Sequence, residues 1–131
     1  PKQQAILVNK VLKDLDFKTF DLRGNVDAAD YRISNTGPVD ELMIYRHFFT
    51  CVSDRFHSSI FTMRISGRSP IGIINKNKWK GNNKLHDLYQ TFNLEKQLLS
   101  SDLREIAEKL PQIIQCVNDI RITKKSFPWN Q

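Results

Sequence analysis

The main chemical feature of the sequence is a group of positive charges with no acidic residue among them. Residues 55–86 contain seven lysines and arginines and neither aspartate nor glutamate, whereas the rest of the chain holds 13 basic and 14 acidic residues. The net charge of +6 therefore arises from this one quarter of the chain. Charges that only confer solubility are usually interspersed, so this segregation predicts an anionic partner.

The spacing of the lysines suggests how such a partner would be bound. In an extended strand, Lys76, Lys78 and Lys80 point to one face, and Trp79 points to the other. Regularly spaced lysines neutralise backbone phosphates, while an aromatic ring stacks on bases. We therefore expect binding to DNA or RNA, which the sequence does not distinguish. The candidate nucleic-acid-binding residues are Arg64, Arg68, Lys76, Lys78, Trp79, Lys80 and Lys84.

Two other interpretations of the same residues stay open. The lysines also suit a solvated edge strand that resists aggregation, with Trp79 in the core. The basic face also suits an acidic protein partner, in which case the chain is an inhibitor or assembly module. A second basic pair, Lys124 and Lys125, is interpreted as part of a solvated terminus.

Catalysis is a further alternative, although we expect a binding protein rather than an enzyme. His47, His57 and His86 could serve a small metal-independent nuclease as general acid and base, with Arg64 or Arg68 on the phosphate. No catalytic residue is assigned, because the sequence does not fix the geometry of these side chains. The glycines are isolated and form no phosphate-cradling loop, so no cofactor is expected.

The two cysteines, Cys51 and Cys116, lie far apart and lack the paired spacing of a zinc site. We expect two buried, reduced thiols, no metal and an intracellular location. The apolar runs are too short to span a membrane. The chain starts at Pro1 without methionine, as expected for a processed N-terminus or for a fragment of a longer protein.

Hydrophobic periodicity predicts the elements that position these residues. Helices are expected over residues 2–15, 38–56 and 85–92, and from residue 102 onward with a kink or a break at Pro111. The segment 38–56 is ambiguous, because HFFTCV at 47–52 is also rich in strand formers, and we favour the helix. In the last helix, an apolar stripe that includes Leu103 and Leu110 is expected to be buried. Weak strands are expected over 17–22 and 31–33. Alternation over 59–65, a turn at 66–70 and a second strand over 71–79 predict a basic β-hairpin.

The predicted fold class is therefore α+β. A small antiparallel sheet with a basic hairpin is flanked by an N-terminal helix and C-terminal helices. The length of 131 residues suits a single domain over 1–131.

Overall fold

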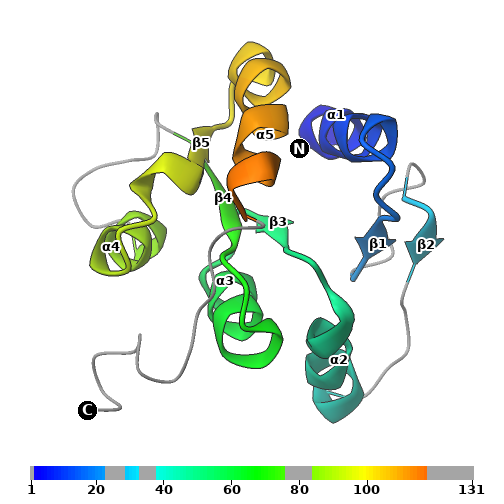
Figure 1. Cartoon of the computed structure of the whole chain (residues 1–131), viewed down its shortest axis with the longest axis vertical. Helices are drawn as coiled ribbons and strands as arrows, with labels where there is room; N and C mark the ends of the chain where they lie inside the picture. Colours follow the sequence, from blue (N-terminus) through cyan, green and yellow to red (C-terminus); the bar gives the residue numbers. More distant parts are fainter. Residues whose placement is uncertain (1, 23–28, 33–37, 76–83, 118–131) are drawn as a thin grey trace.

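The computed structural model describes residues 2–22, 29–32, 38–75 and 84–117. A three-stranded sheet in the order β3-β4-β5 lies between two layers of helices, and a two-stranded sheet, β1-β2, lies to one side (Figure 1). The strands are β1 (Phe20–Asp21), β2 (Tyr31–Arg32), β3 (Val52–Ser53), β4 (Ile71–Ile74) and β5 (Leu98–Ser100). The helices are α1 (Lys2–Asp14), α2 (Pro38–Ile44), α3 (Phe56–Phe61), α4 (Lys84–Thr91) and α5 (Leu103–Val117), with shorter turns η1 (Tyr45–His47), η2 (Thr62–Ser66) and η4 (Glu95–Gln97).

Both sheets are parallel, so the predicted antiparallel sheet is wrong. Val52 of β3 is paired with Ile71 of β4, and Ile73 of β4 is paired with Leu99 of β5, all in the same direction. In the smaller sheet, Phe20 is paired with Tyr31, also in parallel. The connections β3-α3-β4 and β4-α4-β5 are helical crossovers, which parallel neighbours require and a hairpin does not.

The predicted hairpin fails because its first strand is helical. Residues 56–66 form α3 and then a π-helical turn, η2. Phe56, Ile60 and Met63 recur at helical spacing and pack into one apolar cluster, which a strand would split between two faces. Gly67 ends the helix with a φ of 65°, the left-handed conformation common at helix C-termini. The alternation of side-chain types over residues 59–65 therefore does not reflect a strand. The side chains that are buried in this segment recur with the period of a helix.

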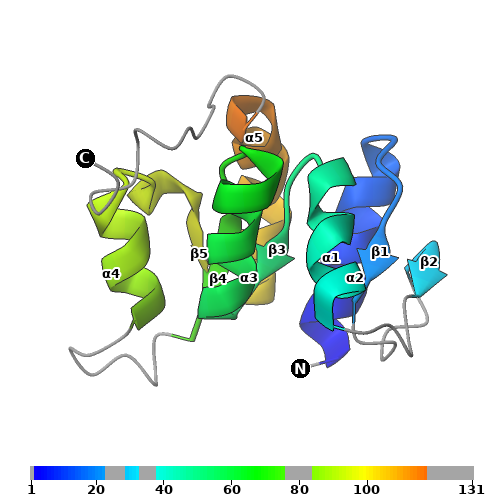
Figure 2. The ribbon, with the colours of Figure 1, turned by 90° about the horizontal axis from the view of Figure 1, so that it is seen from below.

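The central strand β4 is buried on both faces. Ile71 and Ile73 pack with Leu110 and other residues of α5 and with Val8 of α1. On the opposite face, Gly72 lies under Tyr89 of α4 and beside Leu98, in the layer formed by α3 and α4. Figure 2 shows α3 and α5 on opposite sides of the sheet. A short, wholly apolar run is typical of such a strand in a parallel sheet.

The predicted helices at both ends of the chain are confirmed, with two corrections. Helix α5 runs unbroken through Pro111, so the expected break is absent. The predicted helix over 38–56 ends at the η1 turn, after which the chain becomes extended and pairs with β4. Phe49 packs against Phe17 with ring centroids 5.1 Å apart, which ties this extended segment to the end of α1.

Two leucines of α5 that share the predicted stripe differ in burial. Leu110 is fully buried, whereas Leu103 is 40% exposed, so the expected burial of Leu103 is wrong. Leu110→Ala should lower the free energy of unfolding by about 2–5 kcal/mol because it leaves a cavity. Leu103→Ala is the matched control on the same helix and should cost less than about 1 kcal/mol. Urea unfolding of both variants measures the difference, and equal losses would contradict this packing of α5.

A second prediction concerns the close contact at the centre of the sheet. A Cβ at Gly72 would lie 2.8 Å from Leu98 Cδ1 and 2.9 Å from Tyr89 Cζ. Gly72→Ala should therefore destabilise the protein by about 1–3 kcal/mol through overpacking. The loss should be smaller in a Leu98→Ala background, where one of the two contacts is absent. A Gly72→Ala variant as stable as the parent in urea would show that this contact is not tight.

Candidate functional site

The described candidate residues lie at two opposite edges of the sheet. Because the strands are parallel, they all end at one edge, here called the carboxyl edge, and begin at the other, the amino edge. Lys84 is exposed at the start of α4, which follows the carboxyl end of β4. Arg64 and Arg68 precede β4 and belong to the amino edge. Figure 2 shows α3 and α4 each running between the two edges. The structure therefore separates Lys84 from the two arginines.

The other four candidates, Lys76, Lys78, Trp79 and Lys80, lie outside the described residues. They belong to the segment that connects the end of β4 at Ile74 with the start of α4 at Lys84. Both ends of this connection lie at the carboxyl edge. In open sheets of parallel strands, ligands bind at this edge, in the crevice outside the carboxyl ends of the strands.

Arg68 is engaged within the protein. Its guanidinium lies 4.9 Å from the centre of the Phe49 ring, which is cation–π geometry. Its Nη1 atom is buried and has no hydrogen-bond partner among the described residues. The nearby Ser69 and Gln97 side chains are also buried, and Gln97 donates to the Pro70 carbonyl at 2.7 Å. The charge of Arg68 is thus turned toward the interior at the amino edge.

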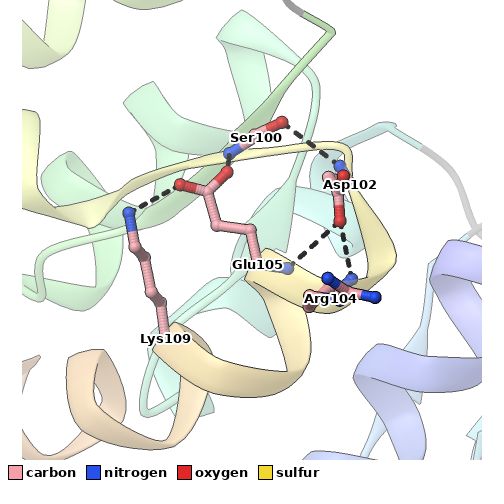
Figure 3. A network of polar contacts seen from close by, with 5 residues as sticks. All are labelled: Ser100, Asp102, Arg104, Glu105 and Lys109. Atoms are coloured by element: carbon pink, nitrogen blue, oxygen red, sulfur yellow. Dashed lines mark hydrogen bonds and ion pairs between the residues drawn. The ribbon is translucent and has the colours of Figure 1, made fainter.

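At the carboxyl edge, the start of α5 is occupied by carboxylates. Asp102 Oδ1 accepts hydrogen bonds from the backbone N–H groups of Arg104 and Glu105 at 2.8 and 3.3 Å. Glu105 accepts from the Ser100 N–H at 2.9 Å and from Lys109 Nζ at 2.6 Å (Figure 3). These bonds, chiefly the one from Lys109, hold the pKa of Glu105 below its usual value. A capping box is thus present in part, and the first N–H groups of α5 are already bonded by Asp102 and so are not available to an external anion.

The starts of α3 and α4 have a different character. Arg55, exposed, precedes α3, and no side chain caps that helix. Its backbone N–H donates to Ser53 Oγ at 3.0 Å, which holds the turn that follows β3. Arg55 and Lys84 therefore place positive charge where β3 and β4 end. Asp54 and Asp87 are exposed nearby in sequence and partly offset it.

A cleft of about 810 Å³ lies beside β3, on the side away from β4. One wall is formed by α1 and β1, and the other by residues 47–55 and the start of α3. Its apolar lining includes Val8, Ile73 and Ile114, and aromatic rings extend toward its β1 side. Phe20 stacks on Tyr31 at 4.9 Å and contacts Phe48 at 5.6 Å. Sequence reasoning missed this cleft, because it depends on the separation of two sheets that are each only two or three strands wide.

The carboxylate of Asp30 stabilises the small β1-β2 sheet beside the cleft. Asp30 Oδ2 accepts the backbone N–H of Thr19 at 2.9 Å, and Lys13 Nζ lies 3.6 Å from Asp30 Oδ1. The Thr19 N–H bond is the main reason that the pKa of Asp30 lies below its usual value. These contacts connect the end of α1 to both strands and so fix the far side of the cleft.

The histidines do not form an evident catalytic group. His57 contacts the rings of Phe56 and Phe61, within its own helix. Arg64 is seven residues farther along the same helical segment, about 10 Å along its axis. His86 belongs to α4, where its Nδ1 lies 3.9 Å from Asp87 Oδ1. His47 alone lines the cleft. The three histidines thus belong to separate elements, and η1, which contains His47, packs against η2, which contains Arg64.

Among the described residues, no group of three or more histidine, cysteine or acidic side chains is placed to hold a metal ion. Within the same part of the chain, none of the helices is long and apolar enough to cross a membrane. Comparison with known protein families, curated proteins and solved structures finds no match.

The two cysteines differ in exposure, which corrects the expectation that both are buried. Cys116 is exposed on α5, whereas Cys51 lies half-buried in the cleft, where desolvation raises the pKa of its thiol to about 11. At pH 8 only about one Cys51 thiol in a thousand is ionised, and the thiolate is the reactive form. Labelling with a disulfide reagent at pH 8 should therefore modify Cys116 first, and Cys116→Ser should abolish the fast phase. Two equally fast thiols would contradict this assignment.

Proposed function

We propose that the protein binds nucleic acid through the carboxyl edge of its three-stranded sheet, at the connection between β4 and α4. The residues assigned to phosphate contacts are Lys76, Lys78, Lys80 and Lys84, with Trp79 for stacking on bases. The observation that carries the proposal is the segregation of charge: residues 55–86 hold seven basic and no acidic residues. No enzymatic step is included.

The parallel topology supports this proposal in a way that the predicted hairpin did not. The lysines of 76–80 lie in sequence between the end of β4 and the start of α4, and both of these described ends are at the edge where parallel sheets bind their ligands. Arg55 and Lys84, exposed at the starts of α3 and α4, add charge to the same edge. Arg64 and Arg68 belong to the amino edge, so we do not include them in the proposed contact surface.

The closest competing interpretation is an acidic protein partner. Both partners would bind through charge and weaken with salt, so salt dependence alone does not separate them. Competition does. Short single- and double-stranded DNA and RNA should bind and compete with one another, whereas polyglutamate of equal charge should compete poorly. The reverse order would favour the protein partner.

Replacement of Lys76, Lys78 and Lys80 by glutamine provides the direct test. Each lost phosphate contact reduces counterion release, so the slope of log K against log salt should fall by about 2–3. Fluorescence anisotropy with labelled oligonucleotides at several salt concentrations measures this slope. The unfolding free energy should stay nearly unchanged.

The matched control removes three positive charges outside the connection between β4 and α4. Lys10→Gln, Arg64→Gln and Lys96→Gln together lower the net charge by three, at exposed positions on α1, η2 and η4. This variant should retain most of the slope. Equal losses in the two triple variants would show that only net charge matters, and an unchanged slope in the first would overturn the proposal.

A further inference from the structure

The first observation is a pair of stacked aromatic rings on the surface beside the cleft. Phe20 of β1 and Tyr31 of β2 have ring centroids 4.9 Å apart and an interplanar angle of 23°. The two residues are 46% and 52% exposed, so neither ring is part of the core. Contiguous apolar surface left in water is unfavourable, and where it persists it commonly marks a binding site.

Hydrogen bonds hold these two rings in position. The Tyr31 N–H donates to the Thr19 carbonyl at 3.0 Å, and the Asp30 N–H donates to Thr19 Oγ1 at 3.0 Å. The Thr19 N–H in turn donates to Asp30 Oδ2 at 2.9 Å. A two-stranded sheet is only marginally stable by itself, so these bonds fix the residues from which the rings project. Rings that are positioned before a ligand arrives lose less conformational freedom when it binds.

The aromatic surface continues into the cleft. Phe20 lines the β1 wall, and its ring centroid lies 5.6 Å from that of Phe48, which lines the opposite wall. Phe17 and Phe49 line the cleft as well, with their ring centroids 5.1 Å apart. The cleft therefore offers aromatic rings on both walls, together with an apolar floor, to a flat ligand group.

The charges that line the cleft cancel. Among the described lining residues, Lys18 and Arg55 are basic, and Asp21 and Asp54 are acidic. A charged group in the cleft would lose hydration without a net attraction, so the cleft suits uncharged rings. Arg55 also stands at the carboxyl end of β3. The cleft and the basic carboxyl edge proposed for phosphate binding are therefore continuous at Arg55.

The length of the cleft indicates a chain-like ligand. Its lining includes every residue from His47 to Arg55. The backbone is extended at Phe48, in β3 and at Arg55, so this run covers about 20 Å at the rise of a strand. A ligand that contacts both Arg55 and the rings of Phe20 and Phe48 therefore has several units in a row.

We propose that a single strand of nucleic acid lies along this cleft, with unpaired bases stacked on Phe20, Tyr31 and Phe48 and a phosphate at Arg55. Bases within a duplex stack on one another and are not available to these rings, whereas bases of a single strand stack on aromatic side chains. The inference rests on the proposed function and adds to it a preference for single strands. The segregation of charge does not supply that preference, because the backbone of a duplex is charged as well.

The test measures binding of a labelled oligothymidylate and of a labelled duplex of equal length by fluorescence anisotropy. Phe20→Leu keeps an apolar side chain but removes the aromatic face, so it should weaken binding of the oligothymidylate by about 10-fold. Duplex binding should stay unchanged. Ile6→Ala is the matched control, because Ile6 is also 46% exposed but is not among the described residues that line the cleft. It should change neither affinity.

A second measurement uses the parent chain and so does not depend on the folding of a variant. In the NMR spectrum, the ring protons of Phe20 and Tyr31 should shift when oligothymidylate is added and should not shift with the duplex. Equal shifts with thymidine monophosphate at the same nucleotide concentration would overturn the proposal in favour of a free-nucleotide site.

Failure of this inference is distinguishable from failure of the proposed function. If the parent binds both oligonucleotides, and Phe20→Leu weakens neither of them or both equally, the cleft takes no single strand and the proposed function stands. If the parent binds neither oligonucleotide, the proposed function fails and this inference fails with it.

Discussion

The close approach at Gly72 is the constraint on which the rest of the structure depends. Because Gly72 has no side chain, the Tyr89 ring lies directly against the central strand, and its hydroxyl forms a 2.9 Å hydrogen bond with Ser59 Oγ of α3. This one contact holds β4, α3 and α4 together, and burial of the phenol raises the pKa of Tyr89. With α3 and α4 drawn to one face, α5 and α1 cover the other, and all three strands run in the same direction.

That direction determines what the basic residues can do. On the face of a hairpin, three lysines would have formed a row supported by a strand. In a parallel sheet, the same residues belong to a connection at the carboxyl edge, together with the starts of two helices. Asp102 and Glu105 already bond backbone N–H groups at the start of α5, so the contact surface that we propose comprises only the part of the edge near β3 and β4.

The amphipathic helices could be predicted from the sequence because their apolar stripes are long and regular. The extent of α1 and the start of α5 were predicted within a residue, although α5 continues through Pro111 and the Leu103 side chain is exposed. The strands were harder to predict from the sequence. β3 has only two residues, too few to show an alternating pattern. Residues 59–65 fit the periods of a strand and of a helix alike, and only the burial of both Met63 and Thr62 decides between them. The IGII run of β4 did carry the signal of a strand buried on both faces. Its glycine marks a place where another element approaches closely.

The packing of α1 against α5 has a consequence for the order in which the molecule is assembled. The consecutive units from β3 to β5 make contacts that are local in sequence and can form early. Val8, in contrast, shares its apolar cluster with Ile106, Leu110 and Val117, about a hundred residues away. During synthesis on the ribosome, α1 leaves the exit tunnel long before its binding surface exists. Its apolar stripe stays without its native cover until α5 follows, and closure of this long loop is the slow step expected for contacts of high sequence separation.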